Sequence, residues 1–110
     1  MFKTPLLTGI CTASLCLAFA LAPARAQEAG DAEAGLGLAR SVCAGCHVVE
    51  RGQPPQPESP APSFESLART PGMTALAINV LLRTPHRTMP NLVLNEREVD
   101  DLAAYILSLK

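Results

Sequence analysis

The end of the chain has the clearest pattern of apolar and polar positions. Its apolar residues recur at helical spacing on one face: Val99, Leu102, Ala103, Ile106 and Leu109. Asn95 precedes this run as an N-cap, and Glu98, three residues later, completes a variant of the capping box. Acidic residues crowd the positive end of the helix dipole, and Lys110 stands at its negative end. The pattern predicts an amphipathic helix over 95–110.

Two earlier segments show helical spacing in a weaker form. Asp31 is suited to N-cap a helix over 32–43, and Ser63 to N-cap a short helix over 63–68. Positions four residues apart predict an inward face of the first helix made by Ala34, Leu38 and Val42.

A further helix is predicted over 71–83, where Pro85 ends the pattern. The apolar residues expected to face inward are Leu76 and Val80, with Ile78 and Leu81. No stretch alternates convincingly with period two, so the sequence predicts an all-α domain with no sheet.

Two proline-rich segments separate these helices. Residues 51–62, "RGQPPQPESPAP", contain five prolines and few apolar side chains. Because proline lacks the N–H needed for helix or ladder bonding, we expect an extended surface loop within one domain. Residues 84–91 form a second loop.

The N-terminus has the layout of a secretory signal peptide over residues 1–26. Lys3 precedes an apolar run over 6–22, and the small-residue site Ala24-Arg25-Ala26 follows. The alternative is an uncleaved membrane anchor. Cleavage would leave a short leader, 27–30, and a single domain over 31–110.

Cleavage also changes what the composition implies. Cys11 and Cys16 leave with the signal peptide. Loss of Lys3 and Arg25 leaves seven Lys and Arg against ten Asp and Glu, a formal charge of −3. A mildly acidic domain has no general affinity for nucleic acid or anionic lipid, so we expect membrane association only if the signal stays attached.

The remaining chain is poor in large core residues. Phe64 and Tyr105 are the only aromatic residues after position 26. A domain of about 80 residues is marginally stable alone and is usually stapled by disulfides, a metal or a large buried cofactor. The thin core therefore favours a bulky cofactor.

Cys43, Cys46 and His47 form a C-x-x-C-H motif, which is typical of haem c attachment. Thiol exchange uses C-x-x-C beside a βαβ pattern, and none is predicted. Structural zinc needs four N or S ligands, and only His86 is left to join these three residues. A disulfide fits export but leaves His47 without a role. Haem attachment gives all three a role, with two thioether anchors and His47 as the proximal iron ligand.

Such an iron predicts a second axial ligand on a downstream loop. The candidates are Met73, Met89 and His86. Met73 begins a predicted helix and is expected to be apolar cover, whereas His86 is expected on the surface, with bis-His ligation as the alternative. Met89 is a loop methionine with polar neighbours, which favours it as the ligand over a gap-filling role.

Taken in order, these motifs resemble those of class I c-type cytochromes, specifically the small bacterial periplasmic kind, over most of residues 31–110. "GLGLARSVCAGCH" is similar to the family's first helix and haem-binding turn, and "PSF" at 62–64 to its Pro-x-Leu segment. "MPN" followed by "LAAYILSL" is similar to its distal methionine and C-terminal helix. Ala39 departs from the family, which often has an aromatic residue at that place.

The resemblance implies a cytochrome c fold of about four helices wrapped around one covalently bound haem, with iron as its metal. The first and last helices would cross where Tyr105 packs near Gly35. The Pro62 carbonyl would accept the Nδ1–H of His47, and Phe64 would form part of the haem wall.

We therefore expect a periplasmic electron carrier rather than an enzyme. Its partners would be redox proteins, with a periplasmic dehydrogenase as donor and an oxidase or reductase as acceptor. Two alternatives stay open: a haem c subunit of a larger dehydrogenase or oxidase complex, and a haem enzyme in which peroxide or a gas displaces Met89. His86, Arg83 and Arg87, together with Arg51, are expected to steer the protein toward an acidic patch on a partner. The alternative is that these residues are ordinary solvated charges.

Overall fold

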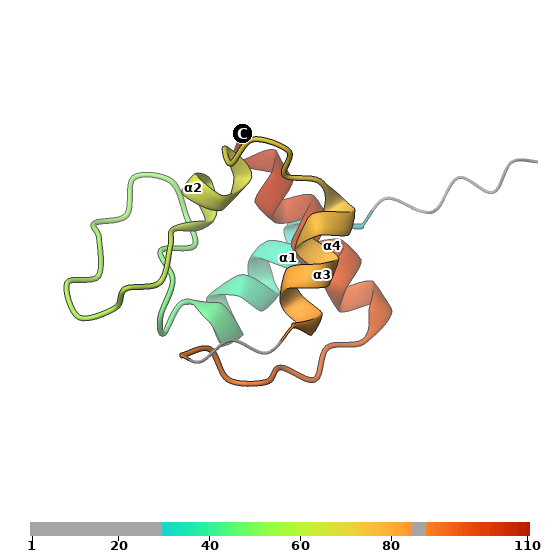
Figure 1. Cartoon of the computed structure of the whole chain (residues 1–110), viewed down its shortest axis with the longest axis horizontal. Coiled ribbons are helices and arrows are strands. Elements are labelled where there is room, and N and C mark those ends of the chain that lie inside the picture. The colour runs from blue at the N-terminus through green and yellow to red at the C-terminus, as the bar shows by residue number, and fades with distance from the viewer. Residues whose placement is uncertain (1–29, 85–87) are drawn as a thin grey trace, which may run out of the picture.

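A computed structural model describes residues 30–84 and 88–110 of the chain. The expected signal peptide, most of the leader, His86 and Arg87 lie outside the described residues. The described part contains α1 (Ala32–Leu38), the π-helical segment η1 (Ala39–Cys43), α2 (Phe64–Ala68), α3 (Ala75–Arg83) and α4 (Glu96–Ser108), and it has no strand. The all-α prediction is confirmed (Figure 1).

Side-chain caps fix where three helices begin, as the sequence predicts. The Asp31 carboxylate accepts hydrogen bonds from the N–H groups of Glu33 and Ala34 at the start of α1. Ser63 caps α2, and Asn95 caps α4 in a capping box with Glu98. These caps satisfy N–H groups that have no partner within the helix.

The start of α3 is a correction to the predicted helix over 71–83. Gly72 has a φ of 80°, a left-handed conformation that ends any helical path through this residue. Thr74 then caps the helix by accepting a hydrogen bond from the N–H of Ala77, so α3 begins at Ala75.

The inward face predicted for α3 is partly wrong. Leu76 is 74% exposed and Val80 also lies at the surface, whereas Leu81 lines the large cavity described below. Ile78 is the buried residue of the helix, and Ala77 and Leu82 pack against the same core. Ile78 and Leu82 are four residues apart and therefore share one face of the helix. Each residue advances the helix by 100°, so Leu76 and Val80 lie on a different face.

The first helix is rotated relative to the prediction as well. Ala34 is exposed and Leu38 is half-buried, whereas Gly35, Ala39 and Cys43 are buried. Val42 is exposed toward the large cavity, which it lines. The reason is that α1 meets α4 along its smallest residues, and these lie one position after the larger apolar residues in the sequence.

The crossing of α1 and α4 depends on Gly35. A Cβ added to Gly35 would clash with the Asp101 carbonyl oxygen and lie 2.8 Å from the Cβ of Tyr105. The expectation that Tyr105 packs near Gly35 is confirmed. Gly30, which was expected in a loose leader, meets the backbone of Asp100 in the same way.

A buried carboxylate joins the same two helices. Asp101 is buried on α4, and its Oδ1 accepts a hydrogen bond of 2.7 Å from the N–H of Asp31. The N-cap of α1 is therefore itself anchored to α4.

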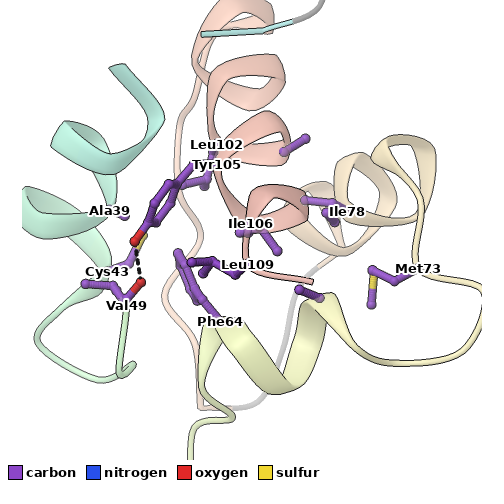
Figure 2. Close-up of a cluster of buried hydrophobic side chains, with 12 residues drawn as sticks. Ala39, Cys43, Val49, Phe64, Met73, Ile78, Leu102, Tyr105, Ile106 and Leu109 are labelled. Atoms are coloured by element: carbon purple, nitrogen blue, oxygen red, sulfur yellow. Dashed lines mark hydrogen bonds between the residues drawn. The ribbon is translucent and has the colours of Figure 1, made fainter. Parts of the chain in front are cut away.

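Tyr105 connects α4 to the segment that follows the C-x-x-C-H motif. Its hydroxyl donates a 2.7 Å hydrogen bond to the carbonyl of Val49, and both residues are buried (Figure 2). Desolvation raises the pKa of the Tyr105 phenol, so the group remains a donor at neutral pH. Without the hydroxyl a buried carbonyl would have no donor, at a cost of about 1–3 kcal/mol.

Two cations bind backbone carbonyls around the end of α4. Arg51 donates to the carbonyls of Ser108 and Lys110, the latter at 2.9 Å, and so caps α4. The Lys110 ammonium donates at 3.0 Å to the carbonyl of Met73. The expected docking cluster stays a prediction, because His86 and Arg87 lie outside the described residues.

Across 30–84 and 88–110, the helices are too short or too polar to cross a bilayer. The apolar run over 6–22 lies outside the described residues.

Gly35 and Gly37 provide a matched test of the helix crossing. We expect Gly35→Ala to lower the free energy of unfolding by about 1–3 kcal/mol, because the new methyl group meets backbone that cannot move without separating α1 from α4. Nothing lies near an added Cβ at Gly37, so Gly37→Ala should gain about 0.5–1 kcal/mol from helix propensity. Denaturant unfolding measures both, and equal effects at the two positions would contradict the close crossing.

Candidate functional site

A large cavity in the described part of the chain brings together the segments that carry the predicted chemistry. Its volume is about 980 Å³, at the upper end of the roughly 300–1,000 Å³ typical of ligand pockets. The lining comes from the C-x-x-C-H turn, the proline-rich loop, α2, α3 and the segment around Met89. All six predicted site residues line it: Cys43, Cys46, His47, Pro62, Phe64 and Met89.

The motif residues leave the helix in a tight turn. The N–H groups of Cys46 and His47 both donate to the carbonyl of Cys43, at 3.1 and 2.9 Å. Neither cysteine forms a disulfide; Cys43 is buried and Cys46 exposed. Burial raises the pKa of the Cys43 thiol because the thiolate would be poorly solvated. Two thiols and an imidazole therefore face one cavity.

The helix widens just before the turn. Residues Ala39–Cys43 are π-helical, and the N–H of Ala44 donates to the carbonyl of Ala39, five residues back, at 3.0 Å. Such π-helical turns are often found at functional sites. No residue in "ARSVC" marks this widening, so it could not be predicted from the sequence.

His47 has its ring fixed from one side. Its Nδ1 lies 2.7 Å from the carbonyl oxygen of Pro62, and as carbonyls only accept, Nδ1 carries the proton. In the neutral ring, this tautomer places the lone pair on Nε2. The Phe64 ring centroid lies 5.4 Å from that of His47, and the Phe64 N–H donates to the carbonyl of Val48. The bond to Pro62 is the one implied by the resemblance, whereas the role of His47 as a ligand stays a prediction.

Both described methionine candidates line the cavity. Met73 belongs to the hydrophobic core cluster, where Figure 2 shows it beside the chain that enters α3. Met89 is half-buried between Thr88 and Pro90 and is not part of that cluster. This difference suits Met73 to apolar cover and leaves the Met89 sulfur available. His86, the third candidate, lies outside the described residues.

The proline-rich loop is more than an extended surface segment. It projects from the helical body between η1 and α2 (Figure 1), yet all of residues 54–62 line the cavity. Gln56 and Ser59 reach from it to carbonyls of the motif turn. Neither residue was predicted from the sequence, because polar side chains in a proline-rich segment carry no local signal of such a contact.

An ion pair connects the two ends of the segment that carries the motif, residues 40–50. Arg40 donates to both carboxylate oxygens of Glu50, from Nε to Oε1 at 2.9 Å and from Nη2 to Oε2 at 2.7 Å. The hydrogen bond to Arg40 holds the pKa of Glu50 below its ordinary value, and the same bond raises the pKa of Arg40. In the sequence, the only indication of this ion pair is that residues of opposite charge lie on either side of the motif.

The zinc alternative finds no support in the described part of the chain. No three His, Cys, Asp or Glu side chains within it gather closely enough to hold a metal ion. Cys43, Cys46 and His47 line one cavity but do not form a chelating cluster.

Comparison with known proteins gives a consistent result. The family model described as "Cytochrome c" matches residues 32–110. The chain is also 40% identical over 97 residues to cytochrome c-552 of Bradyrhizobium diazoefficiens (strain JCM 10833 / BCRC 13528 / IAM 13628 / NBRC 14792 / USDA 110), covering 87% of this chain and 92% of the relative. No solved structure matches the chain significantly.

The Arg40–Glu50 pair predicts a pH dependence of stability. Because the folded-state pKa of Glu50 lies below the ordinary value of 4.5, the stabilisation is fully present above pH 4.5 and is lost as the pH falls through the lowered value. A double-mutant cycle with Arg40→Gln and Glu50→Gln should give a favourable coupling free energy at neutral pH that disappears in acid. A coupling that does not change with pH would contradict this assignment.

Proposed function

The chain belongs to the cytochrome c family and carries covalently bound haem c with its iron; from this premise we propose a periplasmic carrier of single electrons whose iron is held by His47 and Met89. At the coarser level it is a haem-containing electron-transfer cytochrome with the all-helical cytochrome c fold. The relative's name, cytochrome c-552, favours a carrier over an enzyme.

The residues around the cavity fit this group. The walls are mostly apolar, as a macrocycle requires, and the two thiols on one side suit attachment to its two vinyl groups. The imidazole on the same side has Nδ1 bound to Pro62, so Nε2 is the nitrogen that would face the iron, and the Met89 thioether belongs to a different segment of the lining. The proposed division of roles makes Cys43 and Cys46 the thioether anchors.

The hydrogen bond between His47 and Pro62 is the observation that carries the proposal. A metal-binding histidine almost always donates its second ring N–H to a carbonyl or carboxylate, which fixes the tautomer and raises the basicity of the ligating nitrogen. The 2.7 Å contact meets that requirement. Phe64 limits rotation of the ring on its other side.

The chemistry of the bound group is a one-electron exchange between ferric and ferrous iron. No atoms of the protein change bonds in that exchange, so the chain has only to hold its residues in place and exclude water. A neutral thioether from Met89 and apolar walls both favour the ferrous form and so raise the reduction potential. Filled axial positions would leave no site for a substrate.

The proposed location and partners follow from the sequence. Residues 1–26 have the signal-peptide layout, and haem c is attached outside the bacterial cytoplasm. We therefore propose a periplasmic dehydrogenase as the electron donor and an oxidase or reductase as the acceptor. In this proposal Pro62 and Phe64 contact His47 rather than a partner protein.

The thioether anchors can be tested on a gel. After co-expression with a haem-maturation system, we expect the wild-type chain to stain for haem under denaturing conditions, and the Cys43→Ala/Cys46→Ala variant to lose the stain because no thiol remains for attachment. Haem stain that persists on the double variant would contradict the assignment of these two residues.

The two methionines that line the cavity allow a matched test of the distal ligand. Met89→Leu should abolish the sulfur-to-iron charge-transfer band of the oxidised protein, while Met73→Leu, at similar volume, should keep it. Absorption spectroscopy at neutral pH measures both. A band that survives Met89→Leu and vanishes in Met73→Leu would reverse the assignment, and a high-spin wild-type spectrum would favour the enzyme alternative.

A further inference from the structure

Side chains of the proline-rich loop bind the backbone of the motif turn. Gln56 Nε2 donates to the carbonyl of Ala44 at 2.8 Å and to that of His47 at 3.3 Å. Ser59 Oγ donates to the carbonyl of Cys46 at 2.6 Å. Three carbonyls within four residues of the turn thus receive their donors from one loop.

These carbonyls need donors from outside the helix. The turn follows the C-terminal end of η1, where backbone carbonyls have no partner further along the helix. The turn itself uses the carbonyl of Cys43 to bind two N–H groups. Gln56 and Ser59 are both half-buried and lie in the cavity wall, so without them water would have to enter that wall to satisfy the same oxygens.

The same loop also holds the ring of His47. Pro62, three residues after Ser59, supplies the carbonyl that binds Nδ1. The backbone of His47 is therefore held by Gln56 and its side chain by Pro62. A displacement of the turn relative to the loop would change both contacts together.

We propose that Gln56 and Ser59 are positioning residues that set the orientation of His47 and close the His47 side of the cavity to water, and through these effects raise the reduction potential. The inference rests on the proposed function, since it takes His47 as an iron ligand. Neither residue belongs to the C-x-x-C-H motif or to the distal segment. The potential of haem proteins is tuned by hydrogen bonding around the ligands and by burial, which are the two properties that Gln56 and Ser59 affect.

Gln53 offers a matched control within the loop. It is the same residue type three positions earlier, and its amide binds Glu50, with the N–H of Glu50 donating to Gln53 Oε1 at 3.1 Å. It contacts no carbonyl of the motif turn in the described hydrogen bonds and does not line the cavity. Gln53→Ala therefore removes a loop hydrogen bond without touching the turn.

The experiment compares haem-loaded Gln56→Ala, Ser59→Ala, Ser59→Thr and Gln53→Ala with the wild-type protein. Two properties are measured: the reduction potential by redox titration, and the exchange rate of the His47 Nδ1 proton by nuclear magnetic resonance of the reduced protein. We expect a lower potential and exchange about 2- to 10-fold faster in Gln56→Ala and Ser59→Ala, corresponding to the loss of one hydrogen bond. Gln53→Ala should match the wild type, and Ser59→Thr, which keeps the hydroxyl, should restore the wild-type values.

A purely structural role would give a different outcome. Thermal unfolding would then occur at lower temperature in Gln56→Ala while the potential and the Nδ1 exchange rate stay at the wild-type values, and this result would overturn the inference. An equal shift in Gln53→Ala would also overturn it. If Gln56→Ala yields no loaded protein, the Ser59→Ala and Ser59→Thr pair decides the question alone.

Failure of the proposed function is distinguishable from failure of this inference. The function fails if the wild-type protein lacks covalent haem or its sulfur-to-iron band. The inference fails when the wild type has both and the turn variants leave the potential and the exchange rate unchanged.

Discussion

The close crossing of α1 and α4 at Gly35 is the contact on which the rest of the structure depends. A helix of seven residues such as α1 is not stable in isolation. The absence of a side chain at Gly35 lets the two backbones meet, and Asp101 then holds the N-cap of α1. Because η1 and the motif turn continue directly from α1, their position relative to α4 is decided at this crossing.

A small number of hydrogen bonds connect that crossing to the motif turn and fix the position of the turn. Tyr105 on α4 binds the carbonyl of Val49, two residues after His47, and the Arg40–Glu50 pair joins the two ends of the same segment. The motif turn is thus held from α4, from η1 and from the proline-rich loop. Only two aromatic residues, Phe64 and Tyr105, follow position 26, so few large side chains pack around this segment. Hydrogen bonds and the ion pair hold it where a larger core would use apolar side chains.

Much of the fold and of the candidate site could be predicted from sequence because the relevant signals are local. The capping residues Asp31, Ser63 and Asn95 act on the N–H groups immediately after them, and the C-x-x-C-H motif is contiguous. The apolar face of α4 is long enough for its period to be unambiguous. All six predicted site residues line one cavity, although their individual roles remain predictions.

The parts that could not be predicted depend on contacts between distant segments. The predicted inward faces of α1 and α3 were only partly right. A short helix has too few positions to distinguish the face that packs on other helices from the rest of its apolar residues, and a close crossing selects Gly35 and Ala39 over larger residues. Arg51 binds carbonyls at the end of α4, more than fifty positions away. The contribution of Gln56 was missed because a polar side chain in a proline-rich segment has no local pattern that marks it.

The proline-rich loop has a consequence for the cost of folding. Irregular backbone is usually a poor wall for a site, since each of its residues loses conformational freedom when it is ordered. Five of the twelve residues over 51–62 are prolines, whose φ angles are already restricted in the unfolded chain. The conformational entropy lost on folding is correspondingly smaller. A segment without helix or strand can therefore act as a fixed wall beside His47, even in a domain with so little core.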